Sequence, residues 1–164
     1  MSCLHNSEGL EFHIVEGDSL CNKAKTLFPD EPQLFFHMSL PVLDDVDIVH
    51  IGSTLQYIED WKSLLAKLAE YNADTVILAH LQAGNIPKSF VTLQSYYGHK
   101  IPCWFWKIED IVDQMDAIGY ELRFKSRHLA KILGKVGPLP MAALPEEYRM
   151  EYFCQLIFAK KIEP

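Results

Sequence analysis

Residues 47–60 (DIVHIGSTLQYIED) and 75–81 (TVILAHL) decide the fold class, because each holds an apolar run of the length of a short strand. The run at 75–81 is rich in β-branched residues and is typical of a strand buried on both faces. Between the two runs we expect a helix with one apolar side, since apolar residues recur every three or four positions at Trp61, Leu64, Leu65 and Leu68. A strand, a helix and a strand in this order predict two neighbouring parallel strands joined by a right-handed crossover.

The alternation of strands and helices continues outward from this unit. We expect further strands and helices at residues 11–16 (strand), 18–28 (helix), 33–38 (strand), 107–118 (helix), 120–125 (strand) and 152–159 (strand). Asp18 or Ser19 is the expected cap of the first helix, and Gly119 the left-handed residue that ends the last one. The order predicts an α/β fold with a mostly parallel sheet covered by helices. The last two strands have no helix between them, so they are expected to form an antiparallel pair.

Length and composition limit the class of protein. The chain has 164 residues, of which 49% are hydrophobic and 23% charged, so we expect one domain, residues 1–164, with a packed core. A formal charge of −7 argues against nucleic acid as a partner. No apolar run approaches the roughly 18 residues of a membrane span, and no signal peptide is recognisable, so we expect no membrane partner and a cytoplasmic location. The four cysteines and seven histidines have no zinc-binding spacing, so no metal site is expected.

Several stretches of the sequence resemble class I S-adenosylmethionine-dependent methyltransferases. Residues 12–16 (FHIVE) look like the second strand of that fold, which ends in the acidic residue that binds the cofactor ribose, and residues 47–60 look like the fourth strand and its turn. Residues 90–94 (FVTLQ) and 101–105 (IPCWF) resemble a methyltransferase family associated with bacterial surface-polysaccharide genes. The resemblance runs from about residue 11 to residue 159. It implies a Rossmann-like methyltransferase sheet, S-adenosylmethionine as cofactor, and a small-molecule or saccharide acceptor.

The sequence departs from that family in one respect. The family begins with a strand and a glycine-rich turn, in which backbone amides approach the cofactor closely. None of the eight glycines here forms a G-x-G-x-G turn, and only ten residues precede the first expected strand. We therefore expect the first strand to be missing, cofactor binding to be weak or absent, and the exposed sheet centre to be open to self-association. A non-catalytic remnant or binding module is the alternative. A dinucleotide-dependent oxidoreductase is a weaker one, since it too would need a glycine fingerprint.

Residues at the carboxyl ends of the expected strands are the candidates for cofactor binding, because ligands of open α/β sheets bind there. Glu16 offers two acceptor oxygens to ribose hydroxyls, although a solvated carboxylate before a helix would look the same in sequence. Gly52, Ser53 and Thr54 follow the strand at 47–51, and Ser53 or Thr54 could equally be an ordinary helix cap. Ser39 could reach an adenine, but the acid usual near that position is missing.

Acceptor binding and proton transfer have weaker candidates. Histidine at the end of the strand 75–81 could take a proton from an acceptor, although His80 could equally be structural. The candidates for acceptor contact, which could also be packing residues, are Gln56, Tyr57, Thr92, Gln94 and Trp104, with Tyr96, Tyr97 and Trp106 in the same long connection. A basic patch could attract an anionic substrate or could be a solvated face; its members are Lys125, Arg127, His128, Lys131 and Lys135.

Overall fold

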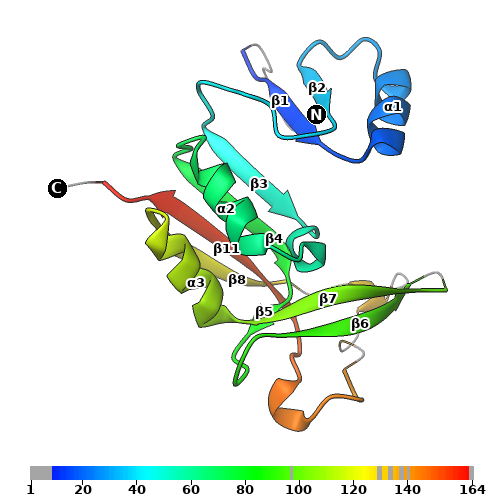
Figure 1. Ribbon diagram of the computed structural model, residues 1–164, viewed down its shortest axis with the longest axis vertical. Helices are drawn as coiled ribbons and strands as arrows, with labels where there is room; N and C mark the ends of the chain where they lie inside the picture. The colour runs from blue at the N-terminus through cyan, green and yellow to red at the C-terminus, as the bar shows by residue number, and fades with distance from the viewer. Residues whose placement is uncertain are drawn as a thin grey trace. The chain divides into compact units, whose positions relative to one another are not determined.

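The computed structural model describes residues 9–96, 98–128, 131–132, 135–136, 139 and 141–162 (Figure 1). It divides into two compact units, residues 1–43 and residues 44–164. The expectation of one domain spanning 1–164 stays a prediction.

The first unit is a strand, a helix and a strand: β1 (Phe12–Val15), α1 (Asp18–Leu27) and β2 (Leu34–His37). The two strands pair in parallel, with Phe12 opposite Leu34 and Val15 opposite His37. Gly17 is the N-cap of α1, with no side-chain cap, so the prediction of Asp18 or Ser19 as the cap is wrong. Asp18 instead lies in the first turn, where its charge favours the helix dipole.

The second unit is built on a four-stranded sheet. Its order is β3 (Ile48–Gly52), β4 (Thr75–Leu81), β11 (Phe153–Lys160) and β8 (Tyr120–His128). β3 and β4 are parallel, as the sequence predicts, and β11 is antiparallel to both of its neighbours, β4 and β8. Three of the four strands therefore run in one direction, and the predicted antiparallel pair of β8 and β11 is confirmed. The fold is α/β and Rossmann-like.

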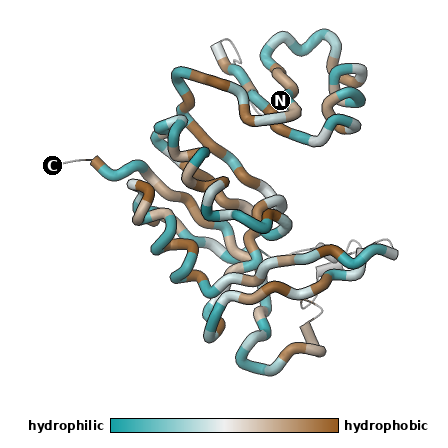
Figure 2. The backbone as a smooth tube through the Cα atoms, in the orientation of Figure 1, coloured by the Kyte–Doolittle hydropathy of each residue, from teal (hydrophilic) through white to brown (hydrophobic). Residues whose placement is uncertain are grey.

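Two helices cover one face of this sheet: α2 (Trp61–Ala69) and α3 (Ile108–Ala117) (Figure 1). Their predicted apolar sides are buried through Trp61, Leu65, Leu68, Ile111 and Met115, and apolar and polar segments alternate along both helices in Figure 2. On β4, Val76 and Leu78 are buried while Thr75, Ile77 and Ala79 are only half-buried. The prediction that residues 75–81 are buried on both faces is therefore wrong for the second face, because α2 and α3 pack on the same side.

The long connection between β4 and α3 carries structure of its own. It contains β5 (Ala83–Gly84), β6 (Phe90–Tyr96) and β7 (His99–Lys107), and β6 and β7 form an antiparallel hairpin (Figure 1). The inner side of this hairpin packs on a second apolar cluster made of Ile86, Leu139, Met141 and Met150. Shorter elements of this unit are η1 (Leu55–Tyr57), β9 (Lys131–Ile132), β10 (Lys135–Val136) and η2 (Glu146–Tyr148).

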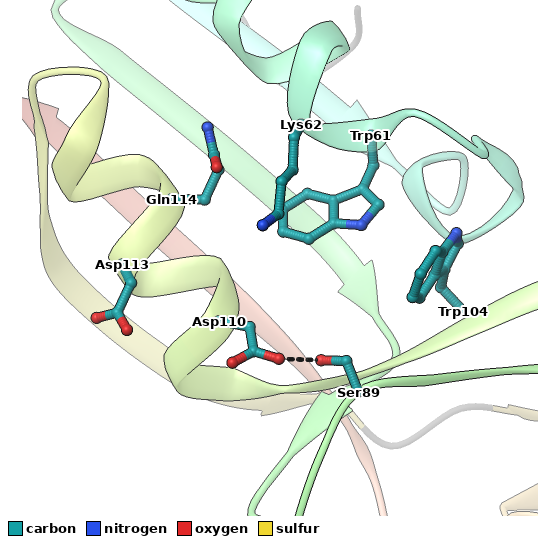
Figure 3. Close-up of a pocket in the computed structure, with 7 residues that line it drawn as sticks. All are labelled: Trp61, Lys62, Ser89, Trp104, Asp110, Asp113 and Gln114. Atoms are coloured by element: carbon teal, nitrogen blue, oxygen red, sulfur yellow. Dashed lines mark hydrogen bonds between the residues drawn. The ribbon is translucent and has the colours of Figure 1, made fainter.

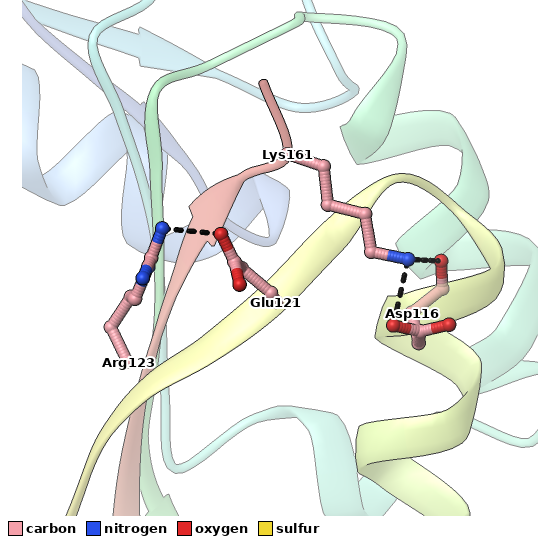
Figure 4. A network of polar contacts seen from close by, with 4 residues as sticks. All are labelled: Asp116, Glu121, Arg123 and Lys161. Carbon is pink, nitrogen blue, oxygen red and sulfur yellow. Dashed lines mark hydrogen bonds and ion pairs between the residues drawn. The ribbon is translucent and has the colours of Figure 1, made fainter. Parts of the chain in front are cut away.

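Polar contacts close the amino end of β8. Gly119 adopts a φ of 91°, so it is the left-handed residue predicted after α3. The buried Tyr120 donates its hydroxyl to the Ala73 carbonyl at 2.9 Å. Two ion pairs lie at the surface, Lys161 with Asp116 at 2.7 Å and Arg123 with Glu121 (Figure 4). Exposed pairs of this kind contribute little to stability.

The described helices include none that is both long enough and apolar enough to cross a membrane.

Candidate functional site at the carboxyl ends of β3 and β4

The two central parallel strands end in residues with unusual backbone conformations. Ser53, directly after β3, and His80, near the end of β4, both have a φ of 54°. Non-glycine residues rarely adopt this left-handed region, which costs about 1–3 kcal/mol per residue and is concentrated at functional sites. The Ser53 amide donates to the Ala79 carbonyl at 3.1 Å, so the two strand ends stay joined up to the turn.

These conformations bring the Ser53 and His80 side chains together. Ser53 Oγ lies 2.8 Å from His80 Nδ1, and both residues are exposed. The predicted candidates for cofactor binding and for proton transfer are thus hydrogen-bonded neighbours. Thr54 Oγ1 donates to the Gly52 carbonyl at 3.0 Å, so this hydroxyl stabilises the turn after β3.

A second imidazole, from β8, lies against the first. The rings of His80 and His128 stack with centroids 3.9 Å apart and planes inclined by 28°. Gln155 Nε2, on β11, donates to His128 Nδ1 at 3.2 Å, because an amide nitrogen can only donate. Burial, and secondarily the neighbouring His80, lowers the pKa of His128. The lowered pKa favours the neutral form of His128, and with Nδ1 as the acceptor of the Gln155 amide, the ring proton of that form lies on Nε2.

The predicted acceptor residues fall into two groups. Tyr57, on η1, donates to Gln94 Oε1, on β6, at 3.0 Å and so ties the turn after β3 to the hairpin. Gln56 beside it is buried, and its contact with the acceptor stays a prediction. Thr92 lies two residues from Gln94 on β6, opposite Cys103, and is half-buried.

Trp104 belongs to a separate hollow between α2 and α3 (Figure 3). This pocket has a volume of about 390 Å³ and is lined by Trp61, Lys62, Ser89, Trp104, Asp110, Asp113 and Gln114. Ser89 bonds to Asp110 and also accepts the Lys107 amide at 2.9 Å, so it caps the start of α3. Trp106 stacks beside Trp104 in the hairpin but is fully buried.

Glu16 lies in the first unit, directly after β1. Its carboxylate is exposed and accepts the Gly17 amide at 3.4 Å, so acceptor capacity remains for two hydroxyl groups. Ser39, after β2, is also exposed. On the neighbouring strands, His13 and His37 lie 3.0 Å apart through their ring nitrogens. The first unit thus presents one carboxylate at the carboxyl end of β1.

The remaining predictions concern charge and metals. Lys125 and Arg127 of the predicted basic patch are exposed, and the Arg127 guanidinium lies 4.6 Å from the centre of the Tyr152 ring. Tyr97 lies outside the described residues, as do the side chains of Tyr96, Lys131 and Lys135. Within the described ranges, no three His, Cys, Asp or Glu side chains gather as metal ligands would.

Sequence reasoning missed the stack of His128 on His80 and the hydrogen bond of Gln155 to His128. His128 appears there only as a member of a basic patch, and Gln155 is not singled out at all. No local sequence pattern marks His128 or Gln155, because strand pairing alone brings them near His80: β11 pairs with β4 on one side and with β8 on the other.

Comparison with known proteins adds information at the level of structure. No protein-family description and no curated protein sequence matches the chain. Solved structures do match. A candidate S-adenosylmethionine-dependent methyltransferase from Listeria monocytogenes aligns over 93% of this chain and 81% of its own, with a TM-score of 0.65 and 9% identity. A SAM-dependent methyltransferase from Methanosarcina mazei aligns over 96% and 85%, with a TM-score of 0.64 and 12% identity.

The fold is that of S-adenosylmethionine-dependent methyltransferases. A further match with this methyltransferase fold is 1,6-didemethyltoxoflavin-N1-methyltransferase from Burkholderia thailandensis, solved with 1,6-didemethyltoxoflavin and S-adenosylhomocysteine. It aligns over 90% of this chain and 59% of its own, with a TM-score of 0.55 and 10% identity. At identities this low the likeness describes the fold, and the chemistry has to be argued from the residues themselves.

Proposed function

We propose that this protein binds S-adenosylmethionine and transfers its methyl group to a small-molecule acceptor. The observation that carries the proposal is the hydrogen-bonded pair of Ser53 and His80, in strained conformations at the carboxyl ends of two parallel strands. Ligands of open α/β sheets bind at this edge. The methyltransferase fold of the chain supports S-adenosylmethionine as the ligand.

The residues fit part of the cofactor. In the first unit, Glu16 is proposed to accept the ribose hydroxyls, since its carboxylate is exposed and has acceptor capacity left. In the second unit, Gly52, Ser53 and Thr54 are proposed to line the cofactor. When bound, S-adenosylmethionine supplies a methyl group on a sulfonium, so the protein has mainly to position the acceptor in line with it.

The methionine end of the cofactor is the part that these residues do not match. A glycine-rich turn would supply backbone donors to it, and the spacing of the eight glycines provides no G-x-G-x-G turn. Hydrogen bonds to charged groups are worth about 1.5–3 kcal/mol each, so the loss of two lowers affinity about a hundredfold or more. This favours a second candidate function, a binding module that keeps the fold without holding the cofactor.

An NMR titration separates the two functions, because it detects weak binding. The 164-residue protein, labelled with ¹⁵N, is titrated with S-adenosylmethionine and, as a matched control, with adenosine. Methyl transfer predicts saturable shifts at Glu16 and at residues 52–54, which the variant Glu16→Gln weakens. No shift up to millimolar cofactor would contradict the proposal and leave the binding module.

The finer features are proposals as well. We propose an acceptor from the small-molecule or saccharide class, in contact with Tyr57, Gln94, Thr92 and Trp104. A link to bacterial surface polysaccharides, self-association through the sheet centre and a cytoplasmic location stay predictions from the sequence.

A further inference from the structure

His80 has one ring nitrogen bonded to Ser53, and among the described residues no hydrogen bond engages the other. Its Nδ1 lies 2.8 Å from Ser53 Oγ, while its ring is exposed at the sheet edge. The hydrogen bond on one ring nitrogen decides which nitrogen carries the proton. If Nδ1 holds the proton and donates it to Ser53 Oγ, then Nε2 keeps a lone pair that can accept a proton.

We infer that His80 Nε2 is the proton acceptor for the methyl acceptor, with Ser53 and His128 as its positioning residues. This inference rests on the proposed function. In this assignment Ser53 Oγ, which lies 2.8 Å from Nδ1, accepts its proton, and the His128 ring stacked on His80 holds the plane of that ring. Gln155 in turn holds His128 through Nδ1, so the assembly spans β3, β4, β11 and β8.

The stacked pair of rings disfavours a state in which both rings are charged. The pKa of His128 is lowered, and an acceptor role of its Nδ1 toward the Gln155 amide fits the neutral form. Two rings with centroids 3.9 Å apart cannot both take a proton without strong repulsion. Among the charged groups on the packed strands, Lys125 and Arg127 lie on β8 near His128 in sequence, and both are exposed. The others are Glu121, Arg123 and Lys160, which lie farther along β8 and β11 from His128.

The chemical step balances with these groups. With S-adenosylmethionine bound, the acceptor oxygen or nitrogen would form a bond to the methyl carbon while the sulfur–methyl bond breaks and leaves its electron pair on sulfur. The proton of the acceptor O–H or N–H moves to His80 Nε2 and later to solvent. A base of this kind serves acceptors that stay protonated at neutral pH, such as an alcohol, a phenol or a ring N–H. A thioether or a free amine would not need it.

Ring-nitrogen NMR on the whole chain tests the tautomer without any ligand. In ¹⁵N-histidine-labelled protein at neutral pH, His80 should carry its proton on Nδ1. Ser53→Gly should abolish that preference, and it suits the left-handed φ at this position, so the fold is kept. His128→Phe, which keeps a stacked ring, should preserve the tautomer. A proton on Nε2 of His80 in the wild-type protein would overturn the inference.

A pair of acceptor probes tests the role of the base. The protein with S-adenosylmethionine is given phenol, which is protonated at neutral pH, or 4-nitrophenol, a substantial fraction of which is ionised there. His80→Asn, which tolerates the left-handed conformation, should slow phenol methylation about a hundredfold and leave 4-nitrophenol methylation nearly unchanged. Equal losses for both probes would contradict a base role. If the wild-type protein methylates neither probe, the proposed function is wrong for phenols. The ring-nitrogen NMR of His80 then tests the inference by itself.

Discussion

At the scale of single residues, the end of β4 shows how one imidazole affects the charge of another. Burial and the nearby His80 both lower the pKa of His128, with burial the larger cause. The stacked geometry explains the second cause, since a proton on either ring raises the cost of a proton on the other.

Replacing His80 by phenylalanine should therefore raise the pKa of His128. The phenyl ring can keep covering His128, so burial remains and the pKa should stay below its usual value of about 6.5. Titration of the His128 ring protons by NMR in the wild-type protein and in His80→Phe measures the shift. The exposed His99 on the hairpin serves as an internal control. An unchanged pKa of His128 would show that the two rings are not electrostatically coupled.

At the scale of elements, close packing of the second cluster depends on one glycine. A Cβ placed on Gly84, in β5, would lie 2.7 Å from Met150 Sδ and 3.0 Å from its Cγ. Met150 is buried among Ile86, Leu139 and Met141, so it has little room to move.

The variant Gly84→Ala should consequently lose about 1–3 kcal/mol of the free energy of unfolding, because it overpacks this cluster. Urea denaturation followed by tryptophan fluorescence measures the loss. Gly52→Ala is the matched control, since its Cβ would meet only the exposed ring of His50, which can turn away. Equal stability losses in the two variants would contradict the packing argument.

The β1–β2 pair should lose stability on acidification. Burial first, then His13 and Lys25, lowers the pKa of His37. The unfolded chain therefore binds the proton more readily than the folded one, and stability falls as pH drops below about 6.5 toward the lowered value. Thermal unfolding followed by circular dichroism at several pH values between 7.5 and 5 should show this fall. It should be smaller in His37→Phe, and an identical pH dependence in both proteins would exclude His37 as the cause.

At the scale of the whole molecule, the sequence predicts those elements whose apolar spacing repeats along the chain. It misses the contacts between side chains that are far apart in sequence. Apolar periodicity locates β3, α2, β4 and α3, because each buries a side that its own spacing defines. The hairpin of β6 and β7 is harder to predict, since its alternation is interrupted by Pro102 and by large aromatic residues. The stack of His80 on His128 has no local signal, because β11 separates their strands. The one-sided burial of β4 follows from where the helices pack.

The buried cysteines provide the chain with built-in reporters of unfolding. Cys21 is the one fully buried residue among those described in the first unit, and Cys103 and Cys154 are buried in the second. Burial raises the pKa of both Cys103 and Cys154 to about 11, so neither should react with iodoacetamide at neutral pH until the second unit opens.

Alkylation across a urea series, read by peptide mass spectrometry, should label Cys21 at a lower urea concentration than Cys103 and Cys154, because the smaller unit has less core to lose. Labelling of all three at one midpoint would show instead that the two units unfold as a single cooperative body. The three thiols thus report the order in which the two units lose their buried cores as the urea concentration rises.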